Sequence, residues 1–129
     1  MANTPAWAGL PVIGMVRIST ANTNRDGTGT LGTLVTGDAS GTVIARVRAV
    51  FSGSSGTTAG MLRYFLNDGT NKRLIMERRV TLINVSATVK GYEDEFELSD
   101  FGLKDATWSL LVGTHNAEQF DVTAYGGKL

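Results

Sequence analysis

The stretch GMLRYFLNDGTNKRLIMERRVTL, residues 60–82, predicts a β-hairpin that decides the fold class. Its central loop, Asn67-Asp68-Gly69-Thr70-Asn71, contains residues that tolerate left-handed backbone angles and hydrogen-bond their own main chain. Side chains alternate along the two flanking runs, with Leu62, Tyr64 and Leu66 opposite Met61, Arg63 and Phe65, and with Leu74, Met76, Arg78 and Val80 opposite Ile75, Glu77, Arg79 and Thr81. Both faces are largely apolar. We therefore expect a strand pair covered on both sides, with Arg63, Glu77 and Arg79 in a cross-strand charge cluster near a rim.

The composition fits one turn-rich, all-β domain. The chain has 129 residues, with 16 glycines and two prolines, and it shows no sustained helical periodicity. Its net charge of zero argues against a general binder of nucleic acid or anionic membranes. The absence of cysteine excludes disulfide and thiolate chemistry. No apolar run is long enough for a membrane-spanning helix, and the start lacks the positive region of a signal peptide, so export by the general secretory route is not expected.

The remaining alternation predicts further strands, for about eight in all. Besides the two strands of the hairpin, they are residues 12–19, 31–36, 42–51, 92–99, 107–114 and 120–126. In residues 42–51 we place Val43, Ala45, Val47, Ala49 and Phe51 on the buried face and Ile44, Arg46, Arg48 and Val50 on the other. The fold predicted is a single-domain antiparallel β-sandwich over residues 12–129, with a jelly roll as the favoured topology.

Candidate partner contacts come from the N-terminal segment and from two rows of charged residues on the predicted strands. Residues 1–11 form a small-residue arm carrying Trp7 and Leu10, which is either a frayed terminus or an arm that docks on a neighbouring subunit. Glu93, Glu95 and Glu97 form an acidic row. This row either faces Arg46 and Arg48, across strands or across a subunit boundary, or it forms a solvated acidic face, which is the simpler interpretation.

No motif predicts catalysis, a cofactor or a firm metal site, and an enzyme is not expected. Asn22, Asn24, Asp26 and Gly27 match positions 1, 3, 5 and 6 of a calcium loop, but Thr33 stands where the bidentate glutamate belongs. An Asx-rich turn is the alternative to a weak calcium site. The glycines of residues 27–32 have dinucleotide-binding spacing but precede a strand instead of a helix. The single histidine, His115, is interpreted as a structural turn residue.

Three stretches, TANTNRDGTGTL (20–31), FLNDGTNKRLIMERRVT (65–81) and LVGTHNAEQFDVTAYGGKL (111–129), resemble small virion structural proteins of tailed bacteriophages. The resemblance implies a capsid decoration (cement) protein on the capsid exterior, present in the host cytoplasm during assembly. Such proteins are commonly β-rich and often trimeric, and they lie over junctions between major capsid subunits. The implied partners are therefore the major capsid protein and further copies of the chain, not nucleic acid or membrane.

A tail- or fibre-associated receptor-binding protein is the alternative. A carbohydrate site would use exposed aromatic residues beside polar loops, for which Trp7, Trp108 and Tyr125 are the candidates. The alternation of Trp108 with Leu110 and Val112 instead favours a position in the core.

Overall fold

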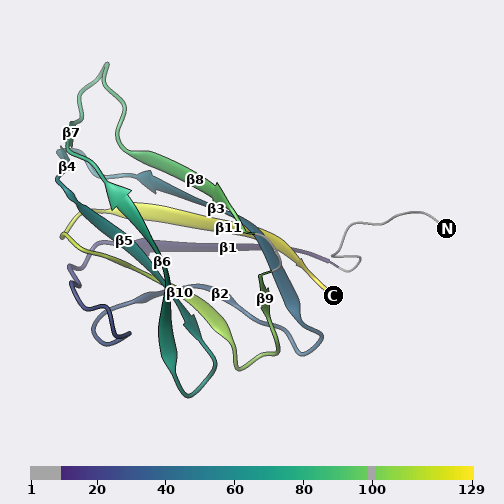
Figure 1. Cartoon of the computed structure of the whole chain (residues 1–129). Helices are drawn as coiled ribbons and strands as arrows, with labels where there is room; N and C mark the ends of the chain where they lie inside the picture. Colours follow the sequence, from purple (N-terminus) through teal and green to yellow (C-terminus); the bar gives the residue numbers. More distant parts are fainter. Residues whose placement is uncertain (1–9, 99–100) are drawn as a thin grey trace.

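A computed structural model describes residues 10–98 and 101–129, and in these residues the protein is all-β (Figure 1). Its strands are β1 (Pro11–Ile18), β2 (Gly32–Thr36), β3 (Thr42–Phe51), β4 (Gly56–Thr57), β5 (Gly60–Asn67), β6 (Lys72–Val80), β7 (Ile83–Asn84), β8 (Glu93–Glu97), β9 (Gly102–Leu103), β10 (Ser109–Thr114) and β11 (Phe120–Lys128). Each predicted strand overlaps one of the longer strands. The two-residue strands β4, β7 and β9 were not predicted. The described segments include no helix of the length and apolarity needed to cross a membrane.

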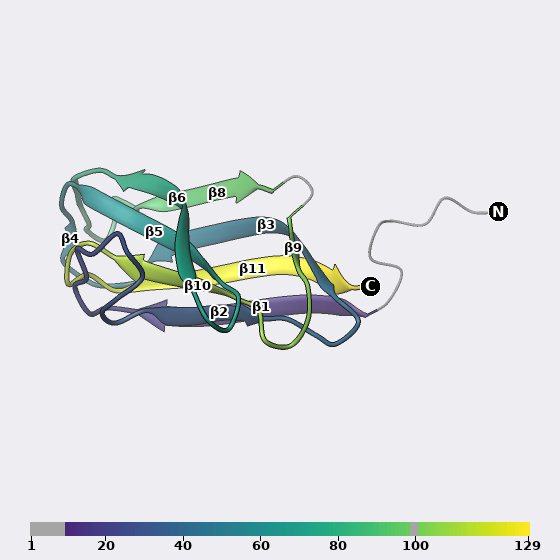
Figure 2. The ribbon, with the colours of Figure 1, turned by 60° about the horizontal axis from the view of Figure 1, so that its bottom comes forward.

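Most of the strands form two antiparallel sheets. The order in sheet A is β1-β11-β3-β8, with β9 also paired to β3, and the order in sheet B is β2-β10-β5-β6. β4 and β7 form a separate two-stranded ribbon. In Figure 2 the long strands of sheet A run side by side, and sheet B lies over one of their faces.

One apolar core joins the two sheets. Its fully buried members alternate along the strands, with Ile44, Val47, Ala49, Phe120, Val122 and Ala124 from sheet A and Leu62, Tyr64, Leu110 and Val112 from sheet B. The Phe120 ring makes edge-to-face contacts with Phe51, at a centroid distance of 5.8 Å, and with Tyr92, at 6.1 Å. Trp108 also packs against this core. The inward faces predicted for residues 107–114 and 120–126 are therefore confirmed.

The predicted faces of β3 are wrong at its beginning because the strand contains a β-bulge. Tyr125 is paired with Arg46, and the next residue, Gly126, is paired with Ile44, so Ala45 is the extra residue. The extra residue reverses the alternation, which buries Ile44 completely and leaves Ala45 only partly buried. Gly126 is required here, since a Cβ at this position would lie 1.8 Å from the main-chain oxygen of Val43.

The central hairpin is confirmed, with one correction in β6. Gly69 has a φ of 93°, and Asp68 accepts hydrogen bonds from the N–H groups of Thr70 and Asn71 across the turn. A second bulge, at Ile75, places Leu74 opposite Phe65. Leu74 therefore leaves the face of Met76, where the alternation had placed it, and faces away from the core.

The loop formed by residues 19–31 covers part of the outer face of sheet B. Ala21 bridges to Thr114, and a Cβ at Gly27 would lie 2.5 Å from the Cβ of Lys72 on β6. Phe65 and Leu111 are buried without belonging to the core between the sheets. We attribute their burial to this loop, which explains why both faces of β5 are apolar.

Candidate functional site

The outer face of sheet A gathers most of the predicted contact residues. β3 pairs with β8, and Arg46 and Arg48 form ion pairs with Glu95 and Glu93, with N–O distances of 3.0 Å and 3.9 Å. The sequence left open whether the arginine row would face the glutamate row across strands or across a subunit boundary, or whether the glutamates would be solvated. In the structure the two rows pair across neighbouring strands of one sheet. All four side chains are about half exposed. Each such pair contributes at most about 1 kcal/mol of stability. Because the two arginines balance the charges of Glu93 and Glu95, this part of the face is almost neutral instead of acidic.

The apolar part of this face lies along β1. Ile13 and Met15 point outward on alternate positions, and their exposed fractions are 62% and 74%. β1 is an edge strand of sheet A, and its outward residues lie beside those of β11, where Ile13 is opposite Tyr125 and Met15 is opposite Thr123. We call the outward side of Ile13 and Met15 the β1 face. An edge strand with exposed apolar side chains is a surface that monomeric proteins usually avoid.

A bidentate ion pair closes the far end of the β1 face. Arg17 donates from Nε to Asp121 Oδ1 at 2.7 Å and from Nη2 to Oδ2 at 3.1 Å. These bonds from Arg17 hold the pKa of Asp121 below its ordinary value. An open depression of about 440 Å³ lies beside this pair and Met15, and it is also lined by Val16, Val122 and Thr123.

The predicted arm is only partly described. Trp7 lies outside the described residues. Leu10 is 67% exposed, and its main-chain oxygen accepts a hydrogen bond from the N–H of Lys128 at 2.8 Å. Pro11, which the prediction assigned to the arm, is the first residue of β1. The chain is therefore held to the end of β11 from Leu10 onward.

Sequence reasoning missed an ion pair that links the two sheets. Arg78 on β6 donates two hydrogen bonds to Asp94 on β8, at 2.7 Å and 2.8 Å. Asp94 lies between Glu93 and Glu95 on β8, but its side chain is only 16% exposed. The Arg78 guanidinium also lies 4.8 Å from the centre of the Phe96 ring. We call this pair the Arg78–Asp94 clasp.

The Phe96 ring in turn makes an edge-to-face contact with Tyr64, whose buried hydroxyl has no hydrogen-bond partner among the described residues. Burial raises the pKa of Tyr64 far above its ordinary value of 10.0. Tyr92 lies beside the same cluster, and its hydroxyl donates a hydrogen bond to the main-chain oxygen of Arg79 at 2.8 Å. Burial raises the pKa of Tyr92 to about 12.

The calcium-like loop uses its side-chain oxygens internally. Asn22 Oδ1 accepts a hydrogen bond from the N–H of Asn24, and Asp26 Oδ1 accepts hydrogen bonds from the hydroxyl and the N–H of Thr28. These two bonds from Thr28 hold the pKa of Asp26 below its ordinary value. The arrangement is that of the Asx-rich turn. Within residues 10–98 and 101–129 there is no group of three or more side chains of the metal-binding types.

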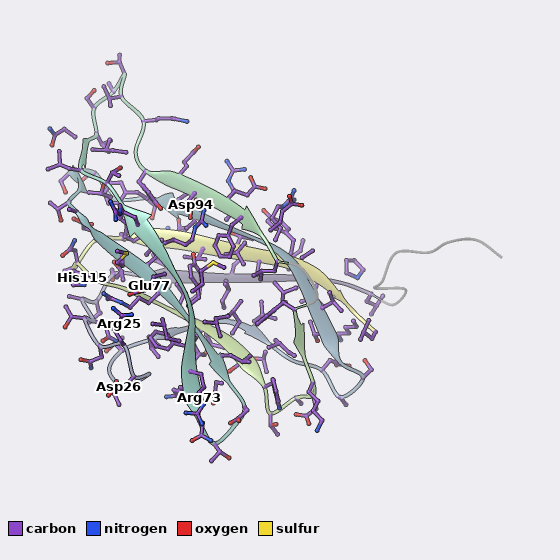
Figure 3. The ribbon with its side chains drawn as sticks, in the orientation of Figure 1. Arg25, Asp26, Arg73, Glu77, Asp94 and His115 are labelled. Atoms are coloured by element: carbon purple, nitrogen blue, oxygen red, sulfur yellow. The ribbon has the colours of Figure 1, made fainter. Side chains whose placement is uncertain are left out.

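His115 belongs to a second polar cluster, on the outer face of sheet B. Arg63 donates from Nε to Glu77 Oε2 at 2.8 Å, and its Nη1 lies 3.2 Å from His115 Nδ1. The other oxygen of Glu77 lies 3.2 Å from a guanidinium nitrogen of Arg25. Figure 3 shows Arg25, Glu77 and His115 close together at the end of the molecule away from the C-terminus. The predicted contact of Arg63 with Glu77 is confirmed, but Arg79, the third member of the predicted cluster, forms no ion pair with the described residues. Arg25 and His115 were not expected there.

The aromatic residues considered for sugar binding are differently placed. Trp108 packs against the core, and the guanidinium of Arg46 lies 4.8 Å from the centre of the Tyr125 ring. Trp108 therefore lies where the alternation predicted, and the guanidinium of Arg46 covers one face of the Tyr125 ring.

Comparison of the chain with models of protein families, with curated proteins and with solved structures found no match.

Proposed function

We propose that this chain is a structural protein of a bacteriophage particle, of the capsid decoration (cement) type, and that it binds the major capsid protein through the β1 face. The resemblance of three sequence stretches suggests the biological setting and favours a trimer. The observation that carries the mode of binding is the exposure of Ile13 and Met15 on an edge strand.

The energetics of the β1 face support a contact made mainly by apolar burial. Covering a large apolar side chain contributes about 1.5–3 kcal/mol, and Ile13 and Met15 retain 62% and 74% of their exposure. Each side chain therefore offers about 1–2 kcal/mol to a partner. The neighbouring charges are already paired with one another, so little electrostatic attraction is left for selecting a strongly charged partner.

The strand order supports a rigid frame for this contact. When only the eight strands of five residues or more are numbered along the chain, the two sheets have the orders 1-8-3-6 and 2-7-4-5. We propose that the sheets form a jelly-roll sandwich, which has this arrangement and occurs in viral capsid and lectin domains. In such a frame β1 is fixed by β11 on one side, so its outward residues are presented in a defined register.

The proposal is tested by the copy number of the protein in purified particles, measured by quantitative mass spectrometry against the major capsid protein. We expect hundreds of copies, near a fixed ratio to the major capsid protein. A few dozen copies would instead favour the tail- or fibre-associated receptor-binding alternative. Absence from the particle would refute both.

A further inference from the structure

A groove on the outer face of sheet B has the composition of a site for an organic anion. It has a volume of about 560 Å³, within the range of roughly 300–1,000 Å³ that is typical of ligand pockets. Its lining residues come from the start of β5, the end of β6 and the turn after β10. They are Ala59, Gly60, Met61, Arg63, Arg79, Val80, Thr81, Leu82 and His115. It lies on the sheet that does not carry the β1 face, so the inference is independent of the proposed function.

The polar side of the groove carries an excess of positive charge. Arg63 is 7% exposed, and the one carboxylate bonded to it among the described residues, Glu77, is shared with Arg25. Arg79 also lines the groove and forms no ion pair within the described part of the chain. Two guanidinium groups, those of Arg63 and Arg79, therefore line the groove, and no carboxylate is among its lining residues. Because a buried cation is only partly compensated by a shared carboxylate, a further anion at this position is favoured.

His115 adds a neutral donor to this side. A guanidinium can only donate, so His115 Nδ1 accepts the hydrogen bond from Arg63 Nη1. The tautomer that accepts at Nδ1 carries its proton on Nε2, and Nε2 has no hydrogen-bond partner within residues 10–98 and 101–129.

The groove lining also contains apolar residues. Leu82 is 64% exposed, and Met61 lies directly across from Arg79 in the pairing of β5 with β6. A ligand that contacts both the charged and the apolar residues has a charged head and a branched or extended hydrocarbon body.

The wall of the groove is held in place before any ligand arrives. Asn116 donates to the main-chain oxygen of Ala59 at 3.1 Å, and Glu118 accepts the N–H of Thr58 at 2.8 Å. The N–H of His115 donates to the main-chain oxygen of Met61 at 2.9 Å. Such preorganisation lowers the entropic cost of binding.

We propose that this groove binds a carboxylate carried on an apolar body. The carboxylate lies between Arg79, Arg63 and His115, and the apolar body lies against Leu82 and Met61. A free carboxylic acid and an acidic side chain beside apolar residues in a peptide share this chemistry.

The proposal is tested by amide chemical-shift titration of the ¹⁵N-labelled full chain. The probes are 3-methylbutanoate, the peptide N-acetyl-Leu-Glu-Leu-amide, and two controls, the uncharged 3-methylbutanamide and inorganic phosphate. We expect saturable shifts at Met61, Leu82 and His115 with the acid or the peptide, and whichever binds more tightly identifies the source of the carboxylate. Absence of shifts with both carboxylates, or equal shifts with the amide or with phosphate, would overturn the proposal.

Matched variants make the test specific. Arg79→Gln removes the unpaired guanidinium and is expected to weaken binding at least about ten-fold, the loss of a hydrogen bond to a charged group. Arg73→Gln is the control, because Arg73 is exposed on the same strand but lies near the hairpin loop and outside the groove lining (Figure 3). Unchanged binding by Arg79→Gln, or an equal loss in Arg73→Gln, would also overturn the proposal.

Discussion

Replacing Arg78 with alanine is expected to destabilise the protein by about 2–3 kcal/mol. Arg78 makes two charge-assisted hydrogen bonds to Asp94 and lies over the Phe96 ring. A hydrogen bond to a charged group contributes about 1.5–3 kcal/mol, and a cation–π contact adds about 0.5–1 kcal/mol. Arg78 is 34% exposed, which lowers the total, but Asp94, at 16%, would be left without its cation.

A double-mutant cycle isolates the clasp from these other effects. We expect a coupling free energy of about 1–2 kcal/mol between Arg78→Ala and Asp94→Ala, measured by urea denaturation. The control cycle is Arg46→Ala with Glu95→Ala, an ion pair between neighbouring strands of sheet A in which both side chains are about half exposed. Its coupling should stay below about 1 kcal/mol. A coupling at the clasp no larger than that of the control would refute the reasoning.

Three further predictions concern the core and the bulge in β3. Tyr64→Phe removes a buried hydroxyl without a described partner and should raise the free energy of unfolding by about 1 kcal/mol in urea denaturation; a loss of stability would show that the hydroxyl is hydrogen-bonded. The folded-state pKa of Tyr92, about 12, lies above the ordinary value of about 10, so its contribution is complete below pH 10 and is lost as the pH rises from 10 to 12. The urea midpoint should fall over that window less steeply in Tyr92→Phe than in the wild type, and equal slopes would contradict this. Gly126→Ala should cost about 3 kcal/mol, because its Cβ would overlap the main-chain oxygen of Val43, and a cost below about 0.5 kcal/mol would argue against the bulge.

Much of the fold could be predicted because period-two alternation is a local property. The turn around Gly69 and the inward rows of β10 and β11 follow from neighbouring residues alone. The bulges at Ala45 and Ile75 could not be predicted, because an extra residue is defined only against the partner strand. The exception with a visible signal is Gly126, since a glycine inside a strand often marks such a position.

The candidate sites were less predictable because they depend on long-range packing. The Arg46 and Glu95 rows could be matched by their charges. The burial of Asp94 was not predicted, because nothing nearby in sequence indicates that Arg78, 16 residues earlier, would reach it. The cluster of Arg25 with Glu77 depends on how the 19–31 loop folds over sheet B, which no local pattern specifies.

The central claim is tested most directly by adding purified protein back to particles that lack it and measuring occupancy. Covering Ile13 and Met15 contributes about 2–4 kcal/mol together, so Ile13→Glu with Met15→Glu should weaken binding roughly 100-fold while leaving stability within about 0.5 kcal/mol. Ile75→Glu, on sheet B, is the control and should bind like the wild type, because it changes an exposed apolar residue outside the β1 face. Wild-type occupancy by the stable double variant would contradict binding through the β1 face.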